Sequence, residues 1–227
     1  MSNSLSEAEQ HDESLSDRIV QQLRNKIITG ELAPGARLRE RELADELGVS
    51  RIPLREAMQQ LESDGFIQSA IRRGAIVTEL TLRDVEELFN VRLCVEVYAT
   101  RLAAQRVADG ASVSELQAAM RQSERAVATG NVNSIAESNA ELHEEIVHLA
   151  DNSLLTTMMR SVSGRDRWIF RMTNSVSRPA AACQEHVELC DAIYAGNPDF
   201  AAAISYSHIE RGRKPTIDVL RSVLPLK

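Results

Sequence analysis

Residues 38–65 read LRERELADELGVSRIPLREAMQQLESDG, and this stretch decides the fold of the N-terminal part of the chain. Apolar residues at 43, 44 and 47, and again at 54, 57, 58 and 61, recur with the spacing of one helix face. Between the two groups, Gly48 stands where a helix end needs a positive φ, and Ser50 stands where the next helix needs an N-cap. The stretch therefore predicts two short helices joined by a tight turn, which is a helix-turn-helix motif.

The second of these helices begins with positive charge. Arg51 and Arg55 lie in its first turn and a half, where the helix dipole favours acids. An outside anion explains the two arginines better, since the second helix of such a motif enters the DNA major groove and arginine suits phosphates and guanine. The alternative is an ordinary amphipathic helix with a solvated face.

The segments on either side complete a small N-terminal domain. Residues 1–14 hold little apolar material and predict a disordered arm. A first helix is expected from 15 to 29, with Ser14 and Asp17 as a capping box. After the helix-turn-helix, Ile67, Ile76 and Val77 flank a basic turn at 71–74, which predicts a short β-hairpin. We expect a winged helix-turn-helix domain over 15–79, with three helices and this hairpin.

From residue 80 to residue 227 the sequence shows only helical patterns. Capping boxes at Thr81 with Asp84 and at Ser112 with Glu115 open two helices, which end near 109 and 130. Further helices are expected over 133–150, 154–175 and up to 194, and from 199 past 211, with Pro215 as a kink or interruption. The fold class is mainly α, and the second domain is an all-α antiparallel bundle of six or seven helices.

The amino-acid composition limits the functional classes to which this protein can belong. Apolar residues make up 43% of the chain and aromatic residues only 4%, which favours helices. No apolar run is long enough to cross a membrane and no export signal is evident, so we expect a cytoplasmic protein whose three cysteines are reduced. The net charge of -7 means that DNA binding depends on local arginines. Such a surface binds weakly as one copy, which predicts a homodimer on a two-fold site.

Three histidines lie on separate helices of the second domain, at His143, His186 and His208. Imidazoles that converge from three helices can hold a divalent metal, although scattered histidines are usually surface or core residues. Asn139 precedes His143 by four residues and shares its helix face. Arg92 lies on an apolar face and needs an anion, which is either Glu96 or an effector carboxylate.

We assign structural roles to the other polar residues of the second domain that could be mistaken for site residues. Arg167 and Arg171 share a stripe on one helix, which could line the pocket, but we expect it to be solvated. His143 and His148 are five apart, so they cannot share a metal as the histidines of a zinc protease do. Cys190 lies among apolar residues and is expected in the core, which argues against a thiolate ligand.

The segment PGARLRERELADELGVSRIPLREAMQQLESDGFI, followed by RRGAIV, resembles the winged helix-turn-helix of GntR-family bacterial transcription regulators. The resemblance implies operator contacts by residues at the start of the first helix of the motif, on the recognition helix and in the wing. These residues are Arg41, Ser50, Arg51, Ile52, Pro53, Arg55, Arg72, Arg73 and Gly74. Ile52 departs from the family, which usually has threonine there, and an apolar side chain can meet a thymine methyl.

The segments RDVEELFNVRLCVE, NAELHEEIVHLADN and EHVELCDAIYAGNPDFAAAISYSHI resemble the FCD effector domain of the FadR subfamily. Many members hold a metal with an aspartate, a histidine four residues later and two more histidines. His143, His186 and His208 fall on the histidine positions, and Asn139 falls on the aspartate position. The resemblance implies a divalent metal at these four residues, and the ligand types favour zinc or nickel. We expect the effector site to include the same four residues and Arg92.

We therefore expect a homodimeric repressor that binds a palindromic operator and responds to a small carboxylate effector. One alternative keeps this role but has a metal-free pocket for a larger acyl ligand. Another is a metallohydrolase with a base at Glu141 or Glu144, which would leave the first 79 residues unexplained. On this ground we expect a regulator and not an enzyme.

Overall fold

The computed structural model describes residues 14–70, 74–173 and 178–224 of the chain. In these ranges it has nine helices and three short strands, which confirms the mainly helical fold class. The chain divides into two compact units, residues 1–78 and 79–227. The predicted disordered arm lies outside the described residues except for Ser14, and so do Arg72 and Arg73.

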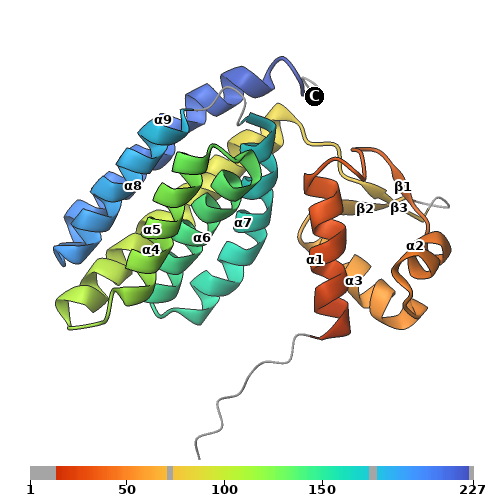
Figure 1. Ribbon diagram of the computed structural model, residues 1–227, viewed down its shortest axis with the longest axis horizontal. Helices are drawn as coiled ribbons and strands as arrows, with labels where there is room; N and C mark the ends of the chain where they lie inside the picture. Colours follow the sequence, from red (N-terminus) through yellow and green to blue (C-terminus); the bar gives the residue numbers. More distant parts are fainter. Residues whose placement is uncertain (1–13, 71–73, 174–177, 225–227) are drawn as a thin grey trace, which may run out of the picture. The chain divides into compact units, whose positions relative to one another are not determined.

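The first unit has three helices and three strands (Figure 1). They are α1 (Leu15–Ile28), β1 (Arg37–Leu38), α2 (Glu40–Leu47), α3 (Arg51–Ser63), β2 (Ile67–Ala70) and β3 (Gly74–Val77). The apolar faces of α1 and α2 pack against α3, so Leu23, Leu54 and Leu61 are fully buried. The capping box of Ser14 and Asp17 is present, and Gly48 ends α2 with φ at 65°. The predicted helix-turn-helix is thereby confirmed.

The wing is larger than the predicted hairpin. β3 pairs antiparallel with β2, where Ala70 lies opposite Gly74, and also with β1, where Arg37 lies opposite Ile76. The result is a three-stranded sheet in the order β1-β3-β2. The sequence analysis missed β1 because a two-residue strand is too short to show an alternating pattern.

The second unit contains six helices in its described residues. They are α4 (Leu82–Ala108), α5 (Ser114–Thr129), α6 (Val132–Leu149), α7 (Ser153–Thr173), α8 (Pro179–Tyr194) and α9 (Pro198–Leu220). α4 contacts α6, α7, α8 and α9, so it is the central helix of the bundle (Figure 1). Thr81 and Asp84 form the predicted capping box at its start. A site built inside this bundle can therefore receive side chains from α4 and the helices around it.

One local prediction in this unit is wrong, and one of the two alternatives expected at Pro215 is excluded. The expected capping box of Ser112 and Glu115 is absent, because α5 begins one residue later than that box requires, with Val113 at the N-cap position and no side-chain cap. The Ser112 hydroxyl instead accepts a hydrogen bond from the backbone N–H of Ser114. Pro215 does not interrupt the last helix, since α9 continues through it to Leu220.

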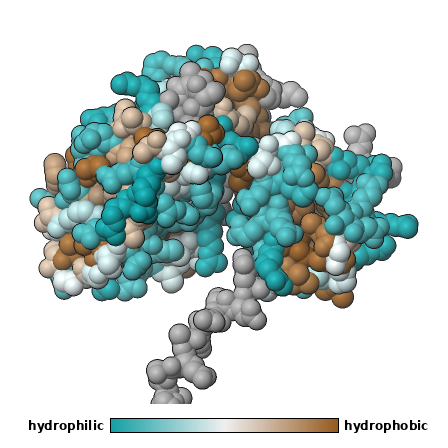
Figure 2. Space-filling model, in the orientation of Figure 1, coloured by the Kyte–Doolittle hydropathy of each residue, from teal (hydrophilic) through white to brown (hydrophobic). Residues whose placement is uncertain are grey.

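The surface of each unit is mixed in character. Figure 2 shows hydrophilic and intermediate residues over much of the visible face of each unit, with hydrophobic residues scattered among them. Among the described residues, no helix has the length and apolar character that a membrane span requires.

Candidate metal centre and nucleic-acid interface

Three histidine rings meet inside the helical unit. His143 comes from α6, His186 from α8 and His208 from α9. Their ring centroids are 5.2 Å (His143 to His186), 5.4 Å (His143 to His208) and 4.7 Å (His186 to His208) apart. One nitrogen from each ring lies within 4.8 Å of the others. The structure thus brings together the three histidines that the sequence analysis singled out.

Carboxylates fix the orientation of two of these rings. Nδ1 of His143 lies 2.9 Å from Glu96, and Nδ1 of His208 lies 2.9 Å from Glu185. A carboxylate only accepts hydrogen bonds, so each Nδ1 donates a proton to its carboxylate, and Nε2 is the ring atom left to face a metal. Nε2 of His143 and both ring nitrogens of His186 are buried without a hydrogen-bond partner in the structure. Buried nitrogens of this kind are expected where a cation is bound.

Burial keeps two of the imidazoles neutral. It lowers the pKa of His186 well below its ordinary value, and the neighbouring His208 and His143 act in the same direction. Burial also lowers the pKa of His208, although the hydrogen bond to Glu185 opposes this. A neutral imidazole is the form that binds a metal. The two rings are therefore in the protonation state that a metal site requires.

Arg92 is buried on α4 and already has two anionic partners. Its Nε donates to Glu96 at 2.6 Å, and its Nη1 donates to Asp166 at 2.8 Å. Burial opposes the charge of Arg92, but Asp166 and Glu96 raise its pKa above the usual range. Glu96 is thus the partner that the sequence suggested as the alternative to an effector carboxylate. Asp166 is a second partner that the sequence analysis missed.

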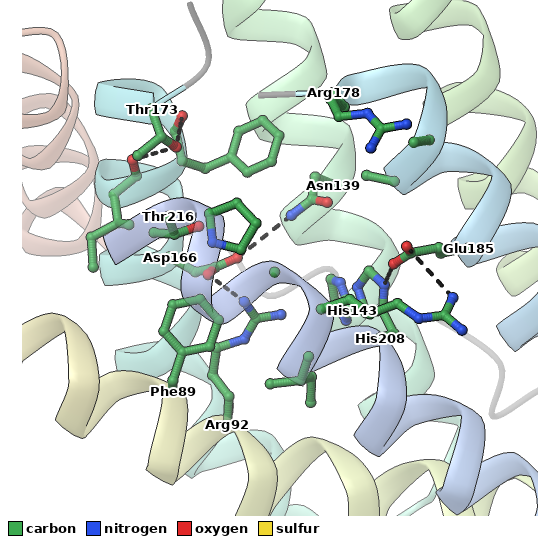
Figure 3. A pocket seen from close by; sticks show the side chains of 18 of the residues that line it. Phe89, Arg92, Asn139, His143, Asp166, Thr173, Arg178, Glu185, His208 and Thr216 are labelled. Carbon is green, nitrogen blue, oxygen red and sulfur yellow. Dashed lines mark hydrogen bonds and ion pairs between the residues drawn. The ribbon is translucent and has the colours of Figure 1, made fainter. Parts of the chain in front are cut away.

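Asn139 is buried beside this ion pair. Its Nδ2 lies 3.5 Å from Oδ2 of Asp166, so the carboxylate lies between Arg92 and Asn139 (Figure 3). A signal for Asp166 existed in the sequence, because it shares a helix face with the buried residues Val162 and Ile169. An acid on an apolar face is a candidate site residue. Glu185 gave no comparable signal, since it stands between two other polar residues, Gln184 and His186.

These groups line a cavity of about 240 Å³ between α4, α6, α7, α8 and α9. Its polar wall contains His143, His208, Asn139, Asp166, Arg92 and Glu185 (Figure 3). Its apolar wall is formed by Phe89, Ile169, Phe170, Pro215 and Val219. Arg178, at the start of α8, is exposed and also lines the cavity. A ligand with a polar head and an apolar body matches this lining.

Several side chains of this half lie away from the cavity. The expectation that Arg167 is solvated is wrong, because it pairs with Glu144 at 2.8 Å and with Glu137 at 3.1 Å and is largely buried. Arg171 donates to the Asn133 side chain. His148 is exposed, unlike the buried His143. Cys190 is buried, and burial raises its pKa to about 12, so it is a core thiol.

The described DNA-contact candidates lie on the surface of the first unit. Arg41, Ser50, Arg51 and Arg55 are exposed, and Ile52 is 72% exposed although it is apolar. Pro53 is half-buried and Gly74, at the start of β3, is exposed. Ser50 is the N-cap residue of α3, but its side chain makes no capping hydrogen bond. The recognition helix thus presents both arginines and an apolar side chain outward.

Within the described part of the chain, the guanidinium of Arg55 has one ion-pair partner. Its Nε donates to Glu40 of α2 at 2.8 Å, in an ion pair in which the arginine remains 61% exposed. The contact uses one of the five N–H groups of the guanidinium. The terminal nitrogens can therefore face a phosphate or a guanine edge.

Comparison with known proteins agrees with both halves of this description. Residues 15–77 match the family described as "Bacterial regulatory proteins, gntR family", and residues 87–211, more than half of the chain, match the FCD domain. The HTH-type transcriptional regulator YdhC of Bacillus subtilis (strain 168), whose own function is uncharacterized, is 34% identical over 143 residues. That match spans 63% of this chain and 63% of the relative.

Two further proteins match over most of the chain. A Paenarthrobacter nicotinovorans protein named "Probable D-xylose utilization operon transcriptional repressor" is 29% identical over 184 residues, or 81% of this chain and 80% of its own. A solved structure of a GntR transcriptional regulator from Rhodococcus sp. RHA1 covers 91% of this chain and 98% of its own, with a TM-score of 0.73 and 25% identity. The chain belongs to the GntR family of bacterial transcriptional regulators, with a winged helix-turn-helix followed by an FCD domain, and it is a regulator rather than an enzyme.

Proposed function

We propose that this regulator is a repressor of the FadR subfamily, which binds a palindromic operator as a homodimer. We further propose that a small carboxylate effector, bound in the helical unit at a divalent metal, controls its operator affinity. The relative from Paenarthrobacter nicotinovorans is named a repressor, which supports the proposed sign of regulation. The observation that carries the metal proposal is the cluster of three histidines, in which the buried His143 and His186 have ring nitrogens without a hydrogen-bond partner among the described residues.

The charges around the histidines support a divalent ion. Glu96, Asp166 and Glu185 bring three negative charges to His143, His208 and Asn139. Arg92 brings one buried positive charge. The exposed Arg211 also lies 3.6 Å from Glu185, so the carboxylates still exceed the arginines by one charge. A divalent cation among the histidines would compensate this negative charge, and buried charges are stable only when they are compensated. Three imidazoles and an amide oxygen favour zinc or nickel.

The cavity indicates how an effector would bind. Because Arg92 is held by Glu96 and Asp166, a carboxylate of the effector is expected at the histidine end instead. When bound, the ion would supply a Lewis-acidic position for a carboxylate oxygen. The apolar wall, with Phe89 and Phe170, would contact the body of the molecule. The effector would change repression only if it binds one arrangement of the two DNA-binding units more tightly than another.

The alternatives receive less support. Glu141 and Glu144 do not line the cavity, and Glu144 is paired with Arg167, so neither is placed as the base of a metallohydrolase. A metal-free pocket for a larger acyl ligand would leave the ring nitrogens of His186 without partners. Elemental analysis of protein purified without an affinity tag separates this alternative from our proposal.

The His186→Ala variant tests the metal and effector roles together. We expect it to bind little zinc or nickel and to lose its response to carboxylate effectors, while operator affinity without effector stays within a few-fold of wild type. Metal content is measured by elemental analysis, and operator binding by gel shift with the promoter fragment upstream of the gene. His148→Ala is the matched control, because this histidine lies on α6 but is exposed. Wild-type protein that takes up no divalent metal would refute the metal centre.

A further inference from the structure

This inference rests on the metal centre proposed above, and it concerns the buried carboxylate of Asp166. Three of the four expected ligands have a carboxylate behind them. Glu96 accepts from Nδ1 of His143, and Glu185 accepts from Nδ1 of His208. Asp166 lies behind Asn139 at a longer distance, with its Oδ2 3.5 Å from the amide nitrogen. The three carboxylates come from α4, α8 and α7, so the pattern is formed by the tertiary fold.

Asn139 is the ligand for which such support matters most. An amide has a donor end and an acceptor end of almost the same shape, so packing alone does not decide which end faces the site. Asp166 decides it by charge, because a carboxylate attracts Nδ2 and repels Oδ1. With Nδ2 directed at Asp166, Oδ1 is left for the opposite side of the amide (Figure 3). Oδ1 is the only atom of this side chain that can bind a cation.

Asp166 also supplies the charge that asparagine lacks. When a carboxylate accepts a hydrogen bond from a metal-binding side chain, it makes that side chain a stronger electron donor to the metal. This effect is known for metal-bound histidine. Asp166 is buried, so water screens its charge little. Its other oxygen accepts from Nη1 of Arg92 at 2.8 Å, and Arg92 is in turn held by Glu96 at 2.6 Å. Arg92 thereby fixes the position of Asp166.

We propose that Asp166 is a positioning residue of the metal site, which turns the Asn139 amide so that Oδ1 faces the ion and supplies the negative charge behind it. Many family members have an aspartate at the position of Asn139 on α6. On this proposal the negative charge of that aspartate is supplied here by Asp166 on α7. Arg92 serves this arrangement by holding Asp166, rather than by binding the effector.

The first test is the Asp166→Asn variant. The new side chain has the same shape, and Arg92 keeps its hydrogen bonds to Glu96, so we expect a folded protein. Zinc affinity is measured on full-length, metal-free protein by competition with a chromophoric chelator. We expect a loss of roughly 10- to 100-fold, the usual effect of removing a group that supports a metal ligand. Asp218→Asn is the matched control, since that carboxylate is exposed on α9 and pairs with Lys214.

The second test returns the charge to position 139. In the Asn139→Asp/Asp166→Asn double variant the number of charges is unchanged, and the amide and carboxylate have exchanged places. We expect it to regain most of the zinc affinity that Asp166→Asn loses. A purely structural role of Asp166 predicts no such recovery. Urea unfolding of the metal-free variants shows whether any change in affinity is only a loss of stability.

The outcomes separate this inference from the proposal on which it depends. Wild-type protein that binds no zinc overturns the metal centre and this inference together. Wild-type protein that binds zinc, with Asp166→Asn equal to it, overturns the role of Asp166 alone. A loss in Asp166→Asn that the double variant does not recover also overturns it, because Asp166 would then act through Arg92 and not through the amide.

Discussion

Arg51 and Arg55 are the side chains on which operator recognition by this regulator is expected to depend. Both are exposed on α3, and the helix itself gains nothing from positive charge at this end. The pair formed by Arg55 with Glu40 is exposed, and such pairs contribute little to stability. Loss of either arginine should therefore affect DNA binding much more than folding.

We predict that the Arg51→Ala/Arg55→Ala double variant binds the operator at least about tenfold more weakly, since a good arginine contact to a base contributes roughly 1–3 kcal/mol. The salt dependence of binding should also become less steep, by about one unit of slope for each arginine that no longer binds a phosphate. Fluorescence anisotropy of a labelled promoter fragment over a series of salt concentrations measures both. Arg83→Ala, which removes an exposed arginine of the helical unit, is the control. Equal titration by the wild type and the double variant would exclude the proposed recognition helix.

At the scale of single elements, the N-termini of α4 and α5 show which hydroxyl groups stabilise the fold. Thr81 accepts a hydrogen bond from the backbone N–H of Asp84 at 3.2 Å, and the Asp84 carboxylate accepts from the Thr81 backbone at 2.8 Å. Ser112, which has the same sequence signature, forms no such pair with Glu115. The two boxes look alike in sequence because the signature specifies residue types, whereas a cap also requires the helix to begin at that residue.

We predict that Thr81→Ala lowers the free energy of unfolding by about 1 kcal/mol, which is typical of a lost N-cap. Ser112→Ala should lower it less, because this hydroxyl forms no capping box and accepts only one hydrogen bond of 3.3 Å, from the backbone of Ser114. Urea unfolding followed by circular dichroism compares the two variants. Similar losses in both would contradict the observed start of α5.

A comparison of alanine substitutions at Gly74 and Gly30 tests whether β1 holds the wing in place. Both have φ at 79°, so alanine is strained at either position. A Cβ at Gly74 would also lie 3.3 Å from the carbonyl oxygen of Leu38, whereas a Cβ at Gly30 would meet nothing within 4 Å. Gly74→Ala should therefore lower the thermal midpoint more than Gly30→Ala, and it should weaken operator binding because the wing is displaced. A smaller effect of Gly74→Ala would mean that β1 does not hold the wing.

For the molecule as a whole, the buried histidines link stability to pH. His186 and His208 have lowered pKa values in the folded protein, so the unfolded chain binds their protons more readily. Stability therefore rises with pH wherever the unfolded histidines still hold protons. Their unfolded pKa is about 6.5, so the dependence falls between roughly pH 5 and pH 7.

We predict that metal-free protein becomes more stable from pH 5 to pH 7, by at most about 1.4 kcal/mol per pH unit for each of these histidines. Urea unfolding in the presence of a chelator measures the slope. The slope should be smaller in His186→Ala and unchanged in His148→Ala, since His148 is exposed. A slope that is the same in wild type and His186→Ala would show that this ring does not titrate on unfolding.

The helical periodicities, the turn at Gly48 and the capping boxes at Ser14 and Thr81 could be predicted from the sequence, because each depends on residues a few positions apart. The three histidines could also be identified, since their helices were evident. The partners of the site were decided only by the tertiary structure. Asp166 and Glu185 reach Asn139 and His208 from other helices, 27 and 23 residues away in the chain. Local patterns carry no information on which helix faces meet, and that packing sets the charge of the site.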